Sequence, residues 1–514
     1  MTIANAAKVN GSVNPALEDL PEGWAVTRLP EICEINPPRP PKDALPADST
    51  VTFVPMPAVD AKEGAITTPE TRTFSEVRSG YTSFRDGDVI MAKITPCMEN
   101  GKAAIARGLH NGMGFGSTEF HVLRPTDAVI PGFVYHFIRQ ESFRRAAEAE
   151  MTGSVGQKRV PLRFLEAVEI PLPPVAEQRQ IVAKVEDLLT RVSAGRERLR
   201  RVPAILKRFR QAVLAAACSG RLTADWREEH PDVEPATDYL NRILDERRLT
   251  GHSTPGKARY LGTLTSGTAE REGLPECWTW ASLSMLATYV GDVDHRMPKA
   301  VDSGIPYVST RDFVDDDAID FEGAKKISEA DFAMLAAKIR PGFGDILLSR
   351  YGTVGQVRLV RDRRAFQASY SIAIIKAIKS GGLHHYTYWA LRSEVVQSQM
   401  LRSIQASAQP DLGLDYIRRL AIPLPPEDEQ REIVRRVGAL LELADTIERR
   451  VAAATARADR LTQSILAKAF RGELVSTEAA LARREGRDYE PASTLLERIQ
   501  RERGAAVDGR KRKR

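Results

Sequence analysis

Carboxylates and histidines are the side chains of this sequence that could take part in hydrolysis. Asp88 and Asp345 each follow a glycine just before a β-prone run, where a nuclease carboxylate could hold a metal ion. A tight Gly-Asp turn explains the same pattern more simply, because both residue types favour turns. The eight histidines are scattered, and the pair His384-His385 is expected at the surface, where a helix starts. We therefore predict no catalytic residue and no metal site in this chain.

One short motif could bind a nucleobase. Asn36-Pro37-Pro38-Arg39 matches three positions of the Asn-Pro-Pro-aromatic motif with which adenine methyltransferases hold the amino group of a flipped base. Arg39 stands in place of the aromatic residue, so a loop after a strand is the preferred interpretation. The glycines of Gly112–Gly116 could imitate a cofactor-binding loop, but no βαβ pattern surrounds them, and a turn is expected. The sequence contains no P-loop, zinc-protease or serine-hydrolase motif.

Polar loops suit a different task, the reading of base edges in the major groove of DNA. Arginine, lysine, glutamine, serine and threonine can match the donors and acceptors that the bases present there. Any one such residue also fits an ordinary exposed side chain. The DNA-binding candidates are Lys93, Lys102, Arg107, Ser117, Thr118, Gln157, Lys158, Arg159, Arg350, Arg358, Arg361, Arg363, Arg364 and Gln409.

The elements that would position these loops occur twice in the chain. Residues 170–189 read IPLPPVAEQRQIVAKVEDLL, and residues 422–441 read IPLPPEDEQREIVRRVGALL, so the copies agree at most positions. Leu-Pro-Glu followed by a tryptophan occurs at Trp24 and again at Trp278. A tandem repeat therefore fills most of the chain, and a duplicated sequence predicts a duplicated structure.

Each repeat has a sheet-like part and a helical part. Residues 24–170 and 278–422 are rich in glycine, proline and short β-prone runs, with helical patches near 131–150 and 384–406. Short strands that turn residues separate are typical of a compact α+β domain dominated by sheet.

A long amphipathic helix is predicted to follow each sheet-like part. Pro174 and Pro426 can start these helices, and Gly220 and Gly472 can end them. Pro203 should bend the first helix without ending it. Apolar residues at three-four spacing give each helix one seam, which predicts that the helices pack antiparallel on each other. The alternative is that each helix covers its own domain. The candidates for the seam and for subunit docking are Gln178, Ile181, Val182, Val185, Leu189, Gln430, Ile433, Val434, Val437 and Leu441.

Composition and charge limit the class of protein. Among 514 residues, 42% are hydrophobic and 28% charged, which excludes a wholly disordered chain. Four distant cysteines indicate neither a disulfide framework nor a structural zinc. No apolar run is long enough for a membrane helix and no signal peptide is apparent, so we predict a soluble, cytoplasmic protein without a membrane partner.

The net charge of +6 is weak evidence for nucleic-acid binding, because residues 508–514 supply five basic residues and one acid. Residues 191–210 are more informative, with eight basic residues against one acid. A helix with such a stripe could run along phosphates, although an ordinary solvated face fits equally well.

The motif Ile-Pro-Leu-Pro-Pro-x-x-Glu-Gln-Arg-x-Ile-Val occurs twice, each time where a sheet-like domain ends and a long helix begins. In this arrangement the chain resembles the specificity subunit of Type I restriction-modification enzymes. Leu-Pro-x-x-Trp at each domain start and the segments around Lys93 and Ser117 fit the same family. The resemblance implies two target-recognition domains, each of which reads one half of a split, asymmetric double-stranded DNA sequence. It also implies that the helices set the spacer and dock two modification subunits, and that two restriction subunits complete the complex.

Under this resemblance the chain is a non-catalytic DNA-recognition and scaffold subunit that binds no cofactor. S-adenosylmethionine, ATP and magnesium would belong to the methyltransferase and motor-nuclease partners. Two alternatives remain open, a single-chain DNA methyltransferase or nuclease and a protein-only coiled-coil adaptor.

The predicted fold class is α+β, with two tandem mostly-β target-recognition domains separated by two long helices packed as an antiparallel coiled coil. The predicted segments are an N-terminal extension (1–19), recognition domain 1 (20–171), long helix 1 (172–222), a helical connector and linker (223–273), recognition domain 2 (274–423), long helix 2 (424–474), a C-terminal helical segment (475–504) and a basic tail (505–514).

Overall fold

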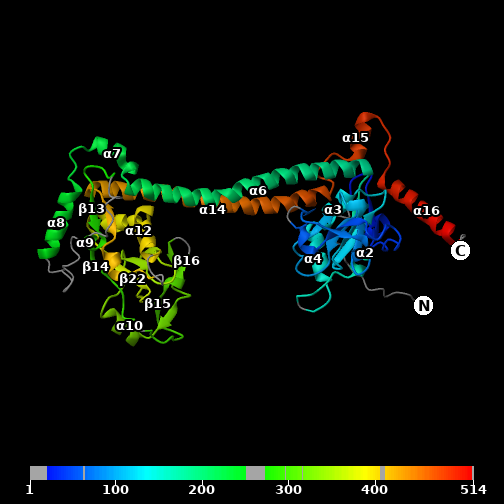
Figure 1. The fold of residues 1–514 in the computed structure, drawn as a ribbon. Coiled ribbons are helices and arrows are strands. Elements are labelled where there is room, and N and C mark those ends of the chain that lie inside the picture. The colour runs from blue at the N-terminus through cyan, green and yellow to red at the C-terminus, as the bar shows by residue number, and fades with distance from the viewer. Residues whose placement is uncertain are drawn as a thin grey trace, which may run out of the picture. The chain divides into compact units, whose positions relative to one another are not determined.

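The computed structural model describes residues 20–511 except 62–63, 155, 250–272, 296, 315–316 and 406–410. The chain forms two compact units, one of residues 1–200 and 453–514 and the other of residues 201–452. Each unit holds one sheet domain, a part of both long helices and a short helical segment (Figure 1). None of the helices in the described ranges is long and apolar enough to span a membrane.

The first sheet domain contains two four-stranded sheets closed by a strand pair at its ends. The closing pair is antiparallel, β1 (Ala25–Arg28) with β12 (Glu169–Leu172). The first sheet is antiparallel, in the order β2 (Cys33–Ile35), β11 (Phe120–Pro125), β8 (Val89–Ala92) and β9 (Ala103–Ile105). The other sheet has the order β6 (Glu70–Thr73), β3 (Thr50–Val54), β10 (Met113–Gly116) and β7 (Thr82–Arg85), and its β3–β10 pair is parallel. The hairpin β4 (Val59–Asp60) with β5 (Ala65–Ile66) and the helices α1 (Leu29–Ile32), α2 (Phe74–Val77), α3 (Pro131–Ile138), α4 (Glu141–Ala149) and α5 (Leu162–Ala167) complete it.

The second sheet domain repeats this plan. Its closing pair is β13 (Thr279–Ser282) with β23 (Ala421–Leu424). Its antiparallel sheet has the order β14 (Ala287–Gly291), β22 (Ile372–Ala377), β19 (Ile346–Ser349) and β20 (Val357–Leu359). Its smaller sheet has the order β18 (Lys325–Ile327), β15 (Ile305–Val308) and β21 (Gln367–Ala368), again with one parallel pair. The hairpin β16 (Phe313–Val314) with β17 (Ala318–Ile319) and the helices α9 (Leu283–Leu286), α10 (Glu329–Ala336), α11 (Leu383–Arg392), α12 (Glu394–Gln405) and α13 (Leu414–Arg418) complete it.

The two domains share strand order and pairing almost one for one, which confirms the predicted pair of tandem, mostly-β domains. Only β7 lacks a counterpart among the described residues of the second domain. Strands β8, β11, β19 and β22 lie where the sequence has β-prone runs. Helices α3 and α4, and likewise α11 and α12, lie in the predicted helical patches.

The central strands are apolar on both faces because helices cover one face and the other sheet of the domain covers the opposite face. In β8, Val89 and Met91 belong to the core that contains α3, whereas Ile90 belongs to a separate core that also contains Val54 of β3 and Phe84 of β7. The period of two along a strand produces this alternation. The strand β19 repeats it, with Ile346 and Leu348 in one core and Leu347 in the other.

The prediction of a turn at the glycine-rich segment Gly112–Gly116 is wrong for most of the segment. Its first residue ends a 3-10 turn, but Met113–Gly116 form strand β10 in the interior of a sheet. A Cβ atom on Gly114 would lie 2.1 Å from the ring of Phe84, so the small residue permits a close side-chain approach. The glycines therefore serve packing within the sheet.

The long helices are α6 (Val175–Cys218) and α14 (Glu427–Ala469), and α6 continues through Pro203. Gly220 and Gly472 have left-handed backbone conformations just past their ends, as predicted. The helices lie side by side within each unit (Figure 1). In the first unit Arg196 forms an ion pair with Asp459, at 2.5 Å. In the second unit the corresponding pair is Arg210 with Asp445 at 2.7 Å, so the helices pack antiparallel.

The seam residues pack both on the other helix and on their own domain. The prediction that the helices pack on each other is therefore confirmed, and the alternative that each helix merely covers its own domain is wrong. Ile181 and Val185 of α6 share a core with Phe133 of α3 and with Leu466 and Phe470 of α14. The core of the second unit combines the other ends of the same helices in the same way, through Val213, Leu214 and Ala217 of α6 and Ile433 and Val437 of α14.

The segments after the two long helices are also related. They contain α7 (Ala224–Glu229) and α8 (Ala236–Leu249) after α6, and α15 (Glu478–Glu485) and α16 (Ala492–Lys511) after α14. The backbone N–H of Ala236 donates to the carbonyl of Cys277 at 2.9 Å, and Ala492 donates to Gly23 at the same distance. Each segment is therefore attached to the start of the sheet domain in its own unit.

Candidate nucleic-acid interface

The first domain gathers six of its predicted DNA-contact residues at one edge. We call this edge the first rim; it consists of Lys93 after β8, Ser117, Thr118 and Glu119 before β11, and Gln157, Lys158 and Arg159 before α5. Backbone hydrogen bonds hold the three segments together. Lys93 N–H donates to the carbonyl of Glu119 at 2.9 Å, and Val160 N–H donates to that of Lys93 at 2.8 Å.

The charges of the first rim are only partly compensated. Arg159 donates through Nε and Nη2 to the two carboxylate oxygens of Glu119, at 2.9 Å each. This bond holds the pKa of Glu119 below its usual range. Lys93 and Lys158 form no ion pair within the described residues. The rim therefore carries an excess of positive charge, together with hydroxyl and amide groups.

Below the first rim, a buried histidine and an asparagine brace the sheet. His121 Nε2 lies 2.9 Å from the carbonyl of Val160, and its Nδ1 lies 3.1 Å from Nδ2 of Asn36. The carboxamide oxygen of Asn36 accepts from Val122 N–H at 3.0 Å. Burial lowers the pKa of His121, which favours the neutral ring. Asn36 thus follows β2 in a loop, as predicted, and its amide is engaged in the sheet.

Two further candidates of the first domain, Lys102 and Arg107, are not among the residues of the first rim. The carbonyl of Lys102 accepts from Ala92 N–H, beside Lys93, at 2.9 Å. Lys102 Nζ donates to the carbonyl of Met56 at 3.0 Å. Arg107 follows β9 and lines a cavity together with Tyr135 and Arg139.

The second domain repeats the backbone of the first rim. Arg350 N–H donates to the carbonyl of Ser371 at 2.9 Å, and Leu412 N–H donates to that of Arg350 at 3.0 Å, as Lys93 and its partners do. Ser369 N–H donates to Val308, as Ser117 N–H donates to Val54. The segment 369–372 is therefore the counterpart of 117–120.

We call the repeated edge the second rim; it consists of Arg350, Tyr351, Ser369, Tyr370 and Asp411, together with His295 after β14. Its chemistry differs from that of the first rim because aromatic residues occupy it. Sequence reasoning missed these residues, since the three rings come from segments far apart in the chain. The predicted Gln409 lies outside the described residues.

Arg350 and Arg358 were predicted to contact DNA, but the structure buries both side chains. Their exposed fractions are 6% and 5%, so their guanidinium groups face the interior. Arg350 forms an ion pair with Asp292 and donates through Nε to Leu412 O at 3.2 Å. Arg358 donates to the carbonyls of Ala318 and Val357. These arginines satisfy buried carbonyl groups and do not reach the surface.

The remaining arginine candidates follow β20, at the opposite end of the sheet from the second rim. Arg361 pairs with Asp317. Arg364 pairs with Glu322 at 3.0 Å, and the guanidinium of Arg363 lies 4.9 Å from the ring centre of Phe343. They form a separate cluster on the second domain.

The turn aspartates have a structural role, as predicted. Asp88 is buried and accepts from Nε and Nη2 of Arg124 at 2.9 and 2.8 Å. Asp345 is likewise buried and forms an ion pair with Lys376 at 2.7 Å. His384 opens α11 as expected but is half-buried, and burial lowers its pKa to about 4. Among the described residues, no group of three or more His, Cys, Asp or Glu side chains could hold a metal ion.

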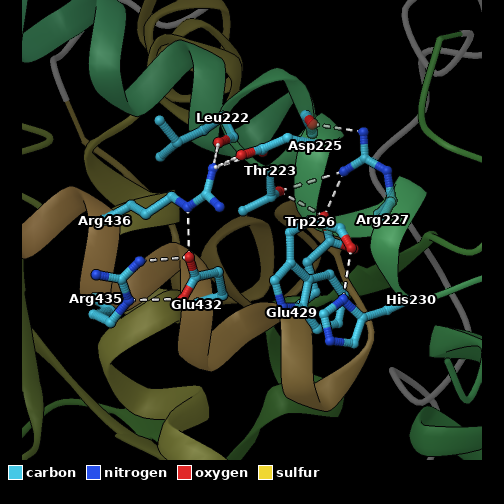
Figure 2. Close-up of polar contacts among 11 residues, drawn as sticks. Leu222, Thr223, Asp225, Trp226, Arg227, His230, Glu429, Glu432, Arg435 and Arg436 are labelled. Atoms are coloured by element: carbon cyan, nitrogen blue, oxygen red, sulfur yellow. Dashed lines mark hydrogen bonds and ion pairs between the residues drawn. The ribbon is translucent and has the colours of Figure 1, made fainter.

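A buried glutamate attaches each long helix to its domain. Glu429, in the first turn of α14, accepts from Trp278 Nε1 at 2.7 Å and from Thr223 Oγ1 at 2.6 Å, and it pairs with Arg227. Figure 2 shows Glu429 beside the segment that follows α6. The counterpart Glu177 in α6 accepts from Trp24 Nε1 at 2.9 Å and from a backbone N–H at 2.8 Å. Burial raises the pKa of Glu177.

A second contact in Figure 2 attaches α14 about two turns further along the helix. Arg436 donates to the carbonyl of Leu222 at 2.9 Å and to Asp225 at 2.6 Å, and its Nε donates to Glu432 at 2.5 Å. Hydrogen bonds from Arg435 and Arg436 lower the pKa of Glu432 to about 2.

The two glutamines among the docking candidates face inward. Gln178 is fully buried, and its amide donates to Ala128 O and accepts from Ile130 N–H. Gln430 is also fully buried, and its amide donates to Pro425 O at 2.8 Å. Both amides bind their own domain, and neither side chain reaches the surface. The apolar candidates are fully buried at Ile181, Val185, Ile433 and Val437 and half-buried at Val182, Leu189, Val434 and Leu441.

Comparison with known proteins gives consistent matches over both repeats. The family described as Type I restriction modification DNA specificity domain matches residues 21–200 and 294–454. The chain is 33% identical over 382 residues to the Type I restriction enzyme EcoBI specificity subunit of Escherichia coli, with 73% of this chain and 72% of that protein covered. It is 31% identical over 315 residues to the EcoAI specificity subunit of Escherichia coli, a match that spans 53% of this chain and 52% of that protein.

The fold also matches a solved structure. The HsdS subunit from Thermoanaerobacter tengcongensis superposes with a TM-score of 0.57 at 23% identity, over 88% of this chain and 98% of that one. At this identity the match concerns the fold alone.

Proposed function

Because this chain belongs to the family of DNA specificity subunits of Type I restriction-modification enzymes, we propose that each of its sheet domains reads one half of a split, asymmetric DNA target. One observation carries the proposal. The same backbone hydrogen bonds build both rims, yet Thr118 and Arg159 of the first rim are replaced by Tyr370 and Asp411 in the second, and the buried Arg350 stands in place of Lys93. A common scaffold with different side chains suits the reading of two different half-sites.

The first rim supplies the chemistry for base and phosphate contacts. Lysine side chains such as Lys158 attract phosphates, which position a protein on DNA without reading its sequence. Ser117 and Thr118 can donate to or accept from base edges. The bidentate bond to Glu119 fixes the plane of Arg159, and a fixed guanidinium discriminates base edges better than a mobile one.

We assign the helix pair the roles of spacer and docking surface. The domains would extend over 20–171 and 274–423, and the helices would set the gap between the half-sites. Two modification subunits would dock along the helices, carrying S-adenosylmethionine and the adenine methyltransferase activity. Two restriction subunits would supply the ATP- and magnesium-dependent motor and nuclease, and the complex would act in the cytoplasm.

The basic stripe of α6 has a smaller part in this proposal. Arg196 and Arg210 form ion pairs with α14, and Arg200 pairs with Glu197 at 2.9 Å. These pairs lower the charge that the stripe could offer to phosphates.

The test is single-molecule sequencing of adenine methylation in a host that expresses this chain with its modification subunit. A host with the modification subunit alone is the control. We expect a two-part methylated motif that disappears without this chain. Exchange of residues 20–171 for those of a relative should change one half of the motif only. Methylation that does not depend on this chain would refute the proposal and favour a protein-only adaptor.

A further inference from the structure

Three aromatic rings meet at the second rim. His295, Tyr351 and Tyr370 come from three segments, after β14, after β19 and before β22. The ring centre of His295 lies 4.9 Å from that of Tyr370 and 6.3 Å from that of Tyr351, and the tyrosine rings are 5.9 Å apart. His295 is exposed and both tyrosines are half-buried. Nearby in the chain, Met297 has an exposed fraction of 69%.

The cations around this aromatic cluster are already engaged. The guanidinium of Arg350 lies 4.7 Å from the ring centre of Tyr351 and pairs with the buried Asp292. Lys338 lies 2.9 Å from Asp294 and 3.8 Å from Asp292. His295 Nε2 lies 3.5 Å from Asp292 as well, so the apolar surface of the second rim consists of the ring faces. The second rim therefore offers aromatic rings where the first offers lysines, and the acids beside them make it poorly suited to a phosphate.

The fold does not require aromatic residues at these positions. The strand pairings place Ile94 of the first domain at the position of Tyr351, and Thr118 at that of Tyr370. The same sheet thus forms with aliphatic and hydroxyl side chains at its rim. A role in contact with another molecule explains partly exposed rings better than a role in folding does.

We propose that His295, Tyr351 and Tyr370 form an apolar platform that contacts the C5 methyl group of a thymine in the half-site read by the second domain. The proposal rests on the proposed function of the chain. Among the bases, thymine alone presents a methyl group in the major groove, and apolar side chains recognise it. The rings are inclined to one another by 33°, 67° and 84°. A flat base could not stack on all three, whereas a methyl group can contact several inclined rings.

The test uses the full chain assembled with its modification subunit. The DNA is an unmethylated duplex that contains the two-part motif identified by methylation sequencing. Each thymine of the half-site assigned to the second domain is replaced in turn by uracil, which removes only the methyl group. We expect one replacement to weaken binding about fourfold, the equivalent of ~0.8 kcal/mol for one buried methyl group. Uracil in the other half-site is the internal control.

Tyr370→Thr introduces the residue found at the equivalent position of the first rim. In this variant the thymine and uracil duplexes should bind equally well, while the response to the other half-site stays unchanged. Tyr370→Phe keeps the ring and should keep the fourfold preference, which separates loss of the platform from loss of folding. A half-site without thymine, no effect of any uracil, or a preference that survives in Tyr370→Thr would overturn the platform alone. The absence of any two-part motif would instead refute the proposed function.

Discussion

The matched glutamates Glu177 and Glu429 allow a sharp test of what attaches each helix to its domain. Both are fully buried, and each accepts a hydrogen bond from a tryptophan. Only Glu429 has a charged partner among the contacts described, because Arg227 pairs with it. Glutamine is nearly isosteric with glutamate, so Glu177→Gln and Glu429→Gln change the charge and one acceptor at each site while the shape is kept.

The expected costs differ by the ion pair. Glu429→Gln leaves Arg227, whose side chain is 18% exposed, without its counter-charge, and breaking such a pair costs about 3 kcal/mol. Glu177→Gln loses one acceptor, which costs on the order of 1 to 3 kcal/mol. Relief of a buried charge partly offsets that loss, because burial has raised the pKa of Glu177, so we expect a net cost of about 1 kcal/mol. The difference of about 2 kcal/mol corresponds to a factor of about 30 in the local opening equilibrium.

Amide hydrogen exchange resolved by peptide is the suitable assay, because it reports each attachment separately. Peptides from the start of α14 and from β13 should exchange about 30-fold faster in Glu429→Gln than the matching peptides of α6 and β1 do in Glu177→Gln, each relative to wild type. Equal costs at the two sites would show that the Arg227 pair adds nothing and would refute this reasoning.

Three further predictions follow from burial and charge. Burial lowers the pKa of His136 to about 3, and neither ring nitrogen has a hydrogen-bond partner among the residues that the structure describes. Because the unfolded chain binds this proton and the folded chain does not, the free energy of unfolding falls as the pH drops below about 6.5, and His136→Phe should remove about 2 kcal/mol of the destabilisation measured by hydrogen exchange between pH 7.5 and pH 5. Leu441→Asp places a charge in the half-buried seam and should lower the free energy of unfolding by about 2 kcal/mol, whereas Leu443→Asp, at a position with 52% exposure on the same helix, should stay within about 0.5 kcal/mol; equal effects would argue against a packed seam. Lys158→Ala should reduce the salt dependence of DNA binding by about one unit of log K against log salt; a slope equal to that of the wild type would exclude a phosphate contact of Lys158.

The sequence predicted the features that depend on local patterning. The strands β8 and β19 and the ends of α6 and α14 follow from runs of apolar residues and from proline and glycine at their boundaries. These signals arise within a few residues of each other, so no knowledge of distant contacts is needed. The repeat also predicted that the two domains share one topology, because two copies of one apolar pattern have to bury the same faces.

The sequence misjudged residues whose surroundings come from distant segments. The sequence predicted Arg350 and Arg358 as surface cations, yet both are buried in the structure. Arg350 forms an ion pair with Asp292, and Arg358 donates to backbone carbonyls. Gly114 read as part of a turn, whereas the ring of Phe84 requires a glycine within a strand. In each case the deciding partner lies many residues away along the chain.

The sequence by itself thus determined the tandem organisation, the helix pair and the family, because periodicity and repeated motifs are properties of consecutive residues. Only the tertiary structure decided which polar residues share a rim and that three aromatic residues meet at the second. Those groupings depend on strand pairings such as Ser349 with Ile372, which bring Tyr351 and Tyr370 together. The register of a sheet is fixed by the burial of whole faces, and a rim residue contributes little to that burial, so its neighbours cannot be read from its own sequence context.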